Sequence, residues 1–171
     1  SRNEIDFGFI GGAQIDKYGN VNSTFIGGDY NKPYKRLAGT AGAVDIGVFA
    51  KDTVILMAHQ KRRIVDFVDY LTTPGWMVKK WPEGTLVRRE ELGLQGGPSS
   101  FISSMGICRF DDTTKIMYLD KYFPGIKPED VKANTGFDID VSRATEADPI
   151  YTDEIKLLRE EIDPLNIYKM R

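Results

Sequence analysis

A glycine-rich loop at residues 36–45 could bind an anion through its backbone. The loop has the sequence RLAGTAGAVD, in which Gly39 and Gly42 precede a segment of helical composition. Such a loop directs free backbone N–H groups at whatever lies in front of it, and these groups could stabilise an oxyanion or receive a phosphate. A tight loop that needs glycine only for a positive φ has the same sequence. The residues alone leave both interpretations open.

A second polar stretch, residues 11–24, has the sequence GGAQIDKYGNVNST and follows an apolar run. Gly19 and Asn20 adopt a positive φ readily, so we predict a strand end, a tight turn and a returning strand over 21–26. On composition alone, the simplest interpretation is a β-turn whose polar side chains are solvated.

A third stretch, residues 59–65, has the sequence HQKRRIV and opens a predicted strand with a cluster of cations. The cluster is either a solvated group of charges or a contact to a phosphate or to another subunit. His59 is the only histidine of the chain and therefore a candidate for acid–base chemistry.

Composition excludes several classes of protein. The formal net charge of −2 lacks the electrostatic footprint of a general nucleic-acid binder. No apolar run approaches the roughly 20 residues of a membrane span. The single cysteine, Cys108, cannot form a disulfide within its own chain; it lies in an apolar segment and is predicted to be a buried structural residue. A lone thiol fits a reducing cytoplasm.

The order of the elements predicts one α/β domain over residues 1–171. Strands are expected over 5–12, 21–26, 54–58, 64–70, 101–110, 115–119 and 137–141. Helices are expected over 43–51, from Lys127 to about Asn134, and from Thr152 with an apolar stripe at Ile155, Leu158 and Ile162. Residues 76–97 are expected to be mostly loop.

The three stretches together resemble the small (beta) subunits of class I coenzyme A transferases, and most closely those of the glutaconate type. The family has a GGAQ-D-YGN-N signature, a G-x-G-G-x-x-D loop, and an H-x-K-R-R-F-V segment followed by a turn like Thr73-Pro74-Gly75. The resemblance continues in one register through Gly96-Gly97-Pro98, residues 106–111 and 123–126, and residues 158–165. It therefore covers essentially the whole chain.

The resemblance implies an open α/β/α sandwich and a reaction that transfers coenzyme A (CoA) from an acyl-CoA to a carboxylic acid. In this family a glutamate attacks the thioester, and a glutamyl-CoA thioester forms. By the same resemblance, the backbone of Gly39 and Gly42 would stabilise the oxyanion. Gln14, Asn20, Arg36 and Asp45 would bind substrate or CoA or support the loops. CoA is expected as a substrate, and no metal is expected.

The chain departs from the family pattern in two places. Ala41 stands where the family usually has glycine, and its methyl group could narrow the pocket or disfavour a positive φ. The catalytic glutamate belongs to an E-x-G motif upstream of the GGAQ segment, and no glutamate here occupies that place. Glu83-Gly84 is interpreted as a turn, and Glu4 as a surface residue.

The chain is therefore expected to be the C-terminal part of a small subunit. It would complete its site with a preceding N-terminal segment and a homologous alpha subunit, in a heterodimer or heterotetramer. The resemblance suggests a short dicarboxylic acyl group.

Two alternatives remain open at this point. Relatives of this fold that lack the glutamate hydrolyse, decarboxylate or ring-open CoA esters. A domain of this class can also bind a ligand or assemble a complex without catalysing a reaction.

Overall fold

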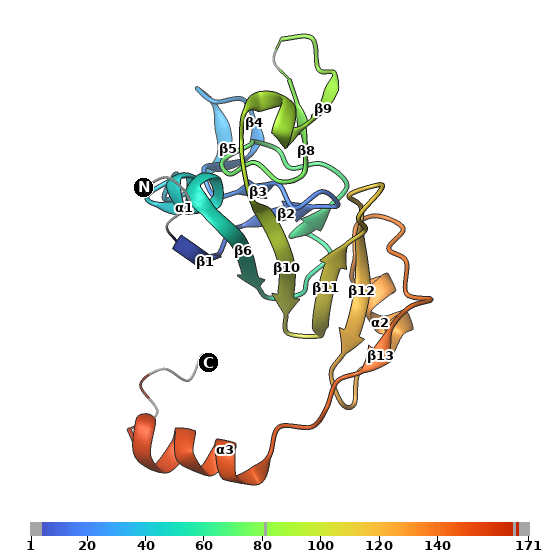
Figure 1. The fold of residues 1–171 in the computed structure, drawn as a ribbon. Helices are drawn as coiled ribbons and strands as arrows, with labels where there is room; N and C mark the ends of the chain where they lie inside the picture. Colours follow the sequence, from blue (N-terminus) through green and yellow to red (C-terminus); the bar gives the residue numbers. More distant parts are fainter. Residues whose placement is uncertain (1–4, 81, 166, 168–171) are drawn as a thin grey trace.

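The computed structural model describes residues 5–80, 82–165 and 167, and a mixed sheet of six strands forms its centre (Figure 1). The strands lie in the order β1 (Ile5–Ile10), β6 (Ala50–Met57), β10 (Gly97–Ser103), β11 (Gly106–Phe110), β12 (Met117–Tyr122) and β13 (Thr145–Glu146). The first three strands are parallel, and β10, β11 and β12 form an antiparallel meander. The α/β class expected from the sequence is confirmed.

Parallel neighbours need long connections, and the connection from β1 to β6 carries most of the polar motifs. It contains β2 (Gln14–Asp16), β3 (Val21–Asn22), the hairpin of β4 (Phe25–Gly28) and β5 (Pro33–Arg36), and the helix α1 (Ala43–Phe49). A small sheet in the order β3-β2-β7 forms where β2 also pairs with β7 (Ile64–Val65).

One face of the central sheet holds the hydrophobic core. Side chains of the small sheet and of α2 (Pro128–Ala133) pack there against β1, β6 and the meander. The helix α1 lies close to β1, since a Cβ atom added at Gly8 would stand 2.3 Å from Ile46. Cys108 is fully buried in this core, as predicted, and burial raises the pKa of its thiol to about 12.

The opposite face of the sheet is apolar at its β1 edge and open. Phe7 and Phe9 alternate with the buried residues of β1 and are 62% and 61% exposed. Leu56 of β6 is 45% exposed on the same side. These side chains leave an apolar patch in the part of the chain that the structure describes.

The helices begin near their predicted positions. α1 ends at Phe49 rather than at residue 51, because Ala50 is already extended and starts β6. α2 has Pro128 at its first position and ends at Ala133. α3 (Thr152–Leu157) continues as a π-turn over Leu158–Ile162 and stands apart from the sheet (Figure 1), and its predicted stripe residues Leu158 and Ile162 are exposed.

The prediction of one strand over 101–110 was wrong, because a turn at residues 104–105 divides the segment into β10 and β11. Ser103 Oγ accepts hydrogen bonds from the N–H groups of Met105 and Gly106, at 3.1 and 3.2 Å. This local side-chain bond closes the turn. The strand predicted at 115–119 is present as β12, which begins at Met117 and extends to Tyr122.

Two other predicted strands are shorter than expected. The 64–70 strand stops at Val65, and the following residues form a loop in which Asp66 pairs with Lys17 at 2.7 Å. The segment 21–26 breaks after Asn22, whose side chain bonds the backbone of Thr24 and Phe25.

Residues 137–141 make only one isolated bridge, between Asp140 and Tyr118. The excursion at 76–97 contains a hairpin of β8 (Met77–Lys79) and β9 (Leu86–Arg88), followed by a 3₁₀ turn at Arg89–Leu92. The predicted turn at Glu83-Gly84 is present in that hairpin, with Gly84 at φ 72°. Glu4 lies outside the described residues.

Candidate functional site

The YGN turn is built around a buried carboxylate. Asp16 accepts hydrogen bonds from the N–H groups of Tyr18 and Asn20, both at 3.0 Å, and from Asn20 Nδ2 at 2.9 Å. Asp16 is 1% exposed. Burial raises the pKa of its carboxyl to about 6, against the opposing effect of these hydrogen bonds.

Asn20, predicted from the resemblance to bind ligand or support loops, joins two turns in the interior. Its Nδ2 also donates to the Met77 carbonyl at 2.8 Å, and its Oδ1 accepts from the Gly75 N–H at 2.7 Å. A Cβ atom at Gly75 would stand 2.2 Å from the Tyr18 carbonyl, so only glycine fits there. These bonds give Asn20 a positioning role, and direct contact with a ligand stays a prediction.

Gln14 is likewise 4% exposed and bonded within the protein. Its Oε1 accepts from Asn22 Nδ2 at 2.8 Å and from the Asp69 N–H at 3.0 Å, and its Nε2 donates to Asp69 Oδ2 at 3.1 Å. The same Asp69 oxygen accepts from the Gly27 N–H at 2.9 Å. Asp69 therefore links Gln14 of β2 to the β4–β5 hairpin, and the predicted contact of Gln14 with substrate is not tested by these bonds.

The glycine-rich loop is fastened to the end of the polar stretch. The Gly39 N–H donates to the Ser23 carbonyl at 2.9 Å, and Ser23 Oγ donates back to the Gly39 carbonyl at 2.8 Å. The Leu37 N–H donates to the Thr24 carbonyl at 2.9 Å. Because the Gly39 N–H already has an acceptor, Gly39 shapes this loop, and a direct oxyanion bond from Gly39 would have to replace the one to Ser23.

The unused donors of the loop lie just beyond Gly39. In the described part of the chain, no acceptor takes a hydrogen bond from the N–H groups of Thr40, Ala41 or Gly42. Ala41 has φ 41°, so its methyl group does not prevent a positive φ here. Gly42 is exposed at the start of α1, and nothing lies within 4 Å of a Cβ added to it.

Arg36 and Asp45 stand on either side of this loop and are both exposed. Arg36 donates to the Tyr30 carbonyl, and its guanidinium lies 4.8 Å from the centre of the Tyr30 ring. This stacking holds Arg36 on the β4–β5 hairpin. Asp45 lies in the first turn of α1, where a carboxylate favours the helix dipole.

His59 is buried and joins the end of β10 to the turn that follows α2. Its Nδ1 lies 2.9 Å from Ser103 Oγ, and its Nε2 lies 3.1 Å from Thr135 Oγ1. Burial lowers the pKa of the imidazole to about 4, so His59 is neutral at pH 7. The structure thus makes His59 a structural side chain rather than an acid–base group open to a substrate.

The three sequence stretches converge on one pocket of about 260 Å³, which we call the cationic pocket. Its lining residues are Ala13, Ile26, Lys35, Leu37, Arg62 and Arg63. Ala13 belongs to the GGAQ segment, Leu37 to the glycine-rich loop, and the two arginines to the HQKRR segment. Lys35 was missed at the sequence level, because its position in the pocket depends on the pairing of β4 with β5.

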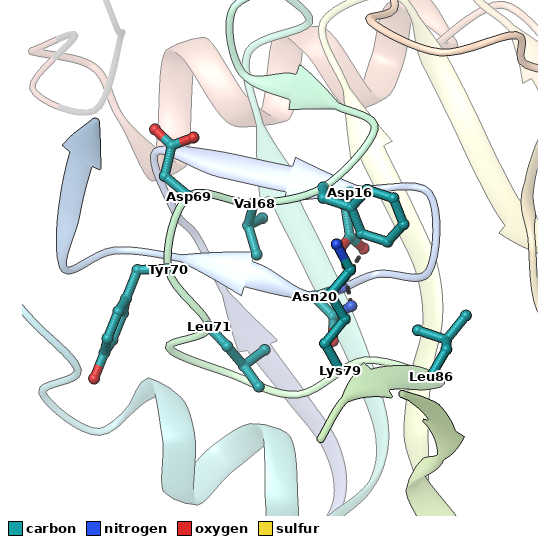
Figure 2. Close-up of a pocket in the computed structure, with 9 residues that line it drawn as sticks. Asp16, Asn20, Val68, Asp69, Tyr70, Leu71, Lys79 and Leu86 are labelled. Atoms are coloured by element: carbon teal, nitrogen blue, oxygen red, sulfur yellow. Dashed lines mark hydrogen bonds between the residues drawn. The ribbon is translucent and has the colours of Figure 1, made fainter. Parts of the chain in front are cut away.

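A second pocket, of about 170 Å³, lies behind the YGN turn (Figure 2). Asp16 and Asn20, joined by hydrogen bonds, line it together with Tyr70 and Lys79. The loop of residues 67–71 supplies most of the residues that line this pocket. These residues were predicted to continue the strand of β7, which instead ends at Val65.

The described residues place no group of three or more His, Cys, Asp or Glu side chains suited to hold a metal ion. None of the helices that the structure describes is both long enough and apolar enough to cross a membrane.

Comparison with known proteins identifies the family. The model of the Coenzyme A transferase family matches residues 2–134. The chain is 52% identical to the B subunit of glutaconate CoA-transferase from Acidaminococcus fermentans over 91% of this chain and 56% of that relative. It is 38% identical to the B subunit of 3-oxoadipate CoA-transferase from Pseudomonas knackmussii over 79% of this chain and 50% of that relative.

The solved structures agree with the sequence relatives. The crystal structure of glutaconate coenzyme A-transferase from Acidaminococcus fermentans superposes with a TM-score of 0.86 at 47% identity, covering 96% of this chain and 61% of that one. The chain thus spans about half the length of the curated relatives it matches. Both the fold and the resemblance expected from the sequence are confirmed, and the chain belongs to the coenzyme A transferase family.

Proposed function

We propose that this chain is part of a CoA transferase that moves CoA between an acyl-CoA and a carboxylic acid. The observation that carries the proposal is the convergence of three separate stretches on the cationic pocket, next to a loop with unused N–H groups. The similarity to the B subunits of two CoA-transferases supports the same reaction.

The reaction would run through a glutamate supplied outside the described residues. The glutamate carboxylate attacks the thioester carbonyl. The CoA thiolate is expelled, and a mixed anhydride of the acyl group and the glutamate is formed. The thiolate then attacks the glutamyl carbonyl, which yields glutamyl-CoA and releases the first carboxylate. An acceptor carboxylate reverses these steps and departs as the new acyl-CoA, so covalent catalysis divides one exchange into easier steps.

The role of this chain in that sequence is to stabilise and position. The N–H groups of the loop at 40–42 would donate to the oxyanion of each tetrahedral intermediate. In other acyl-transfer enzymes one such donor contributes about 3 to 4 kcal/mol. The loops would be held in place by Gln14, Asn20 and Gly39. Substrate or CoA would be bound by Arg36 and Asp45 on either side of the glycine-rich loop.

The names of the relatives bear on substrate and partner. Glutaconate and 3-oxoadipate are both dicarboxylates, so we assign a short dicarboxylic acyl group to this protein. Both relatives are one of at least two kinds of subunit, which supports an alpha subunit as partner, in a heterodimer or heterotetramer. We place the enzyme in the cytoplasm, where the free thiol of Cys108 would stay reduced.

A CoA-exchange assay on the intact protein with its partner subunit tests the proposal. We expect the acyl-CoA to be consumed only when a carboxylate acceptor is present, with formation of the acceptor's CoA ester. Consumption without acceptor would instead establish a hydrolase, decarboxylase or ring-opening enzyme. Tight binding of acyl-CoA without any turnover would make the domain a ligand-binding or assembly module.

A further inference from the structure

Three apolar and three positively charged side chains line the cationic pocket. Ala13, Ile26 and Leu37 supply the apolar surface, and Lys35, Arg62 and Arg63 supply the charge. The three cations come from two segments, the β4–β5 hairpin and the loop before β7. Like charges brought together at one opening repel each other, and a bound anion removes that repulsion.

Gln60 orients both guanidinium groups. Its Oε1 accepts a hydrogen bond from Arg62 Nε and another from Arg63 Nε, each at 3.1 Å. An arginine held at Nε keeps its terminal nitrogens for a ligand, and two adjacent N–H bonds match a carboxylate or phosphate. The shared acceptor thus holds the two side chains side by side.

The pocket contains no internal counter-ion. Across residues 5–80, 82–165 and 167, no carboxylate forms an ion pair with Lys35, Arg62 or Arg63, although seven other ion pairs are present. Nor does any described acceptor take a hydrogen bond from the terminal nitrogens of the two arginines. Donors and charge are therefore available to an external oxyanion.

We propose that Lys35, Arg62 and Arg63 bind an oxyanion of the CoA-ester substrate in this pocket, while the apolar side chains contact the adjoining carbon chain. The inference rests on the proposed function. The oxyanion has two sources, the second carboxylate of a dicarboxylic acyl group and the phosphates of CoA. Both present paired oxygens to the same fork of N–H donors.

The test is binding by the intact protein with its partner subunit, measured by calorimetry for wild type, Arg62→Gln and Arg63→Gln. Four probes separate the sources: glutarate against valerate, which lacks the second carboxylate, and CoA against pantetheine, which lacks the phosphates. We expect about a tenfold or greater loss of affinity for glutarate or for CoA, because each variant removes a charge-assisted bond. The affinity of each variant for valerate and for pantetheine should stay within about twofold of the wild-type affinity.

The pattern of losses decides the matter. A loss confined to glutarate assigns the pocket to the distal carboxylate, and a loss confined to CoA assigns it to the phosphates. Unchanged affinity for all four probes overturns the inference. An equal loss for all four probes also overturns it, since it means a general structural defect.

Two controls keep this result separate from the proposed function. Lys61→Gln removes an exposed cation of the same segment that does not line the pocket, and it should bind all probes as wild type does. Arg62→Lys keeps the charge and should recover part of the affinity. If wild type exchanges CoA while the glutamine variants bind normally, only this inference fails. If wild type shows no exchange, the proposed function fails, and the titrations still decide whether the pocket binds anions.

Discussion

The Gly42 N–H is one of the three unused donors of the glycine-rich loop, and two substitutions test whether the N–H itself or the shape of the loop matters. Gly42 has a negative φ of −87°, the sign that proline requires, so Gly42→Pro deletes the N–H and keeps residue 42 on the same side of φ space. Gly42→Ala retains the N–H in open space. We expect kcat for CoA exchange to fall about a hundredfold in Gly42→Pro, the effect of losing one oxyanion donor.

Gly42→Ala should retain most of the wild-type kcat, and circular dichroism should show both variants folded. Equal losses in the two variants would point to loop shape instead of the donor. Full activity in Gly42→Pro would remove Gly42 from the oxyanion site.

At the level of single residues, the types were predictable and their partners were not. The amides of Gln14 and Asn20 stood out as polar groups in a conspicuous loop, yet both bond within the protein. Their partners, Asp69 and Gly75, lie 55 residues away along the chain. No local pattern encodes a hydrogen bond over that separation.

Arg89 fastens the excursion at residues 76–97 to the rest of the fold. It is fully buried, and its guanidinium donates to the carbonyls of Gly47 at 3.0 Å, Pro74 at 2.9 Å and Gln95 at 3.0 Å. Arg89→Ala would leave these buried carbonyls without their donor. We expect the free energy of unfolding of the intact protein to fall by about 3 kcal/mol in urea denaturation.

Arg88→Ala is the matched control, because Arg88 is exposed and its guanidinium donates to the Thr113 carbonyl at the surface, while its backbone N–H, which donates to Glu91, is retained. Its effect should stay within about 0.5 kcal/mol. Similar midpoints for the two variants would contradict an anchoring role for Arg89.

Elements with a strong local signal were predicted well. β1 begins at Ile5 and Pro128 opens α2, as composition predicted, while β6 overlaps the predicted strand at 54–58 but already begins at Ala50. The strands at 64–70 and 137–141 were overpredicted: their composition suits a strand, but only Ile64–Val65 and Asp140 find a neighbouring strand to pair with. The 76–97 excursion contains a hairpin that was not predicted, and its contacts with the rest of the fold include Arg89, a buried side chain whose partners lie elsewhere in the sequence.

The pH dependence of the global stability should contain two opposing contributions. Asp16 has a pKa raised to about 6 by burial, above its unfolded value, so the stability it contributes is present at low pH and is lost as pH rises through 6. His59 has a pKa lowered to about 4, so its contribution is present above pH 6.5 and is lost as pH falls toward 4. Each amounts to about 3 kcal/mol at most.

Because the two contributions oppose each other, these two groups should change the free energy of unfolding of the wild type, measured in urea, only a little between pH 4 and 7. Relative to wild type, His59→Gln should become less stable as pH rises through this window, and Asp16→Asn should become more stable. Parallel curves for wild type and both variants would show that neither group titrates differently in the folded and unfolded states.

For the molecule as a whole, the family fold could be anticipated from motifs spread along the entire chain. The cationic pocket could not, because it joins Ala13, Lys35 and Arg62 from three segments whose relative register appears only in three dimensions. The pairing of β4 with β5 and of β2 with β7 determines which charged side chains line the pocket.

The strand order also has a consequence for the sequence of folding events. β10, β11 and β12 are joined by short turns and can pair early, whereas β1 can pair with β6 only after the intervening chain from Ile10 to Ala50 is brought together. Four of the six residues around the cationic pocket lie within that intervening chain. We therefore expect the complete chain, when it refolds from denaturant, to form its meander first and its anion-binding surface last, so that a partly folded molecule already has a sheet before it can bind a substrate.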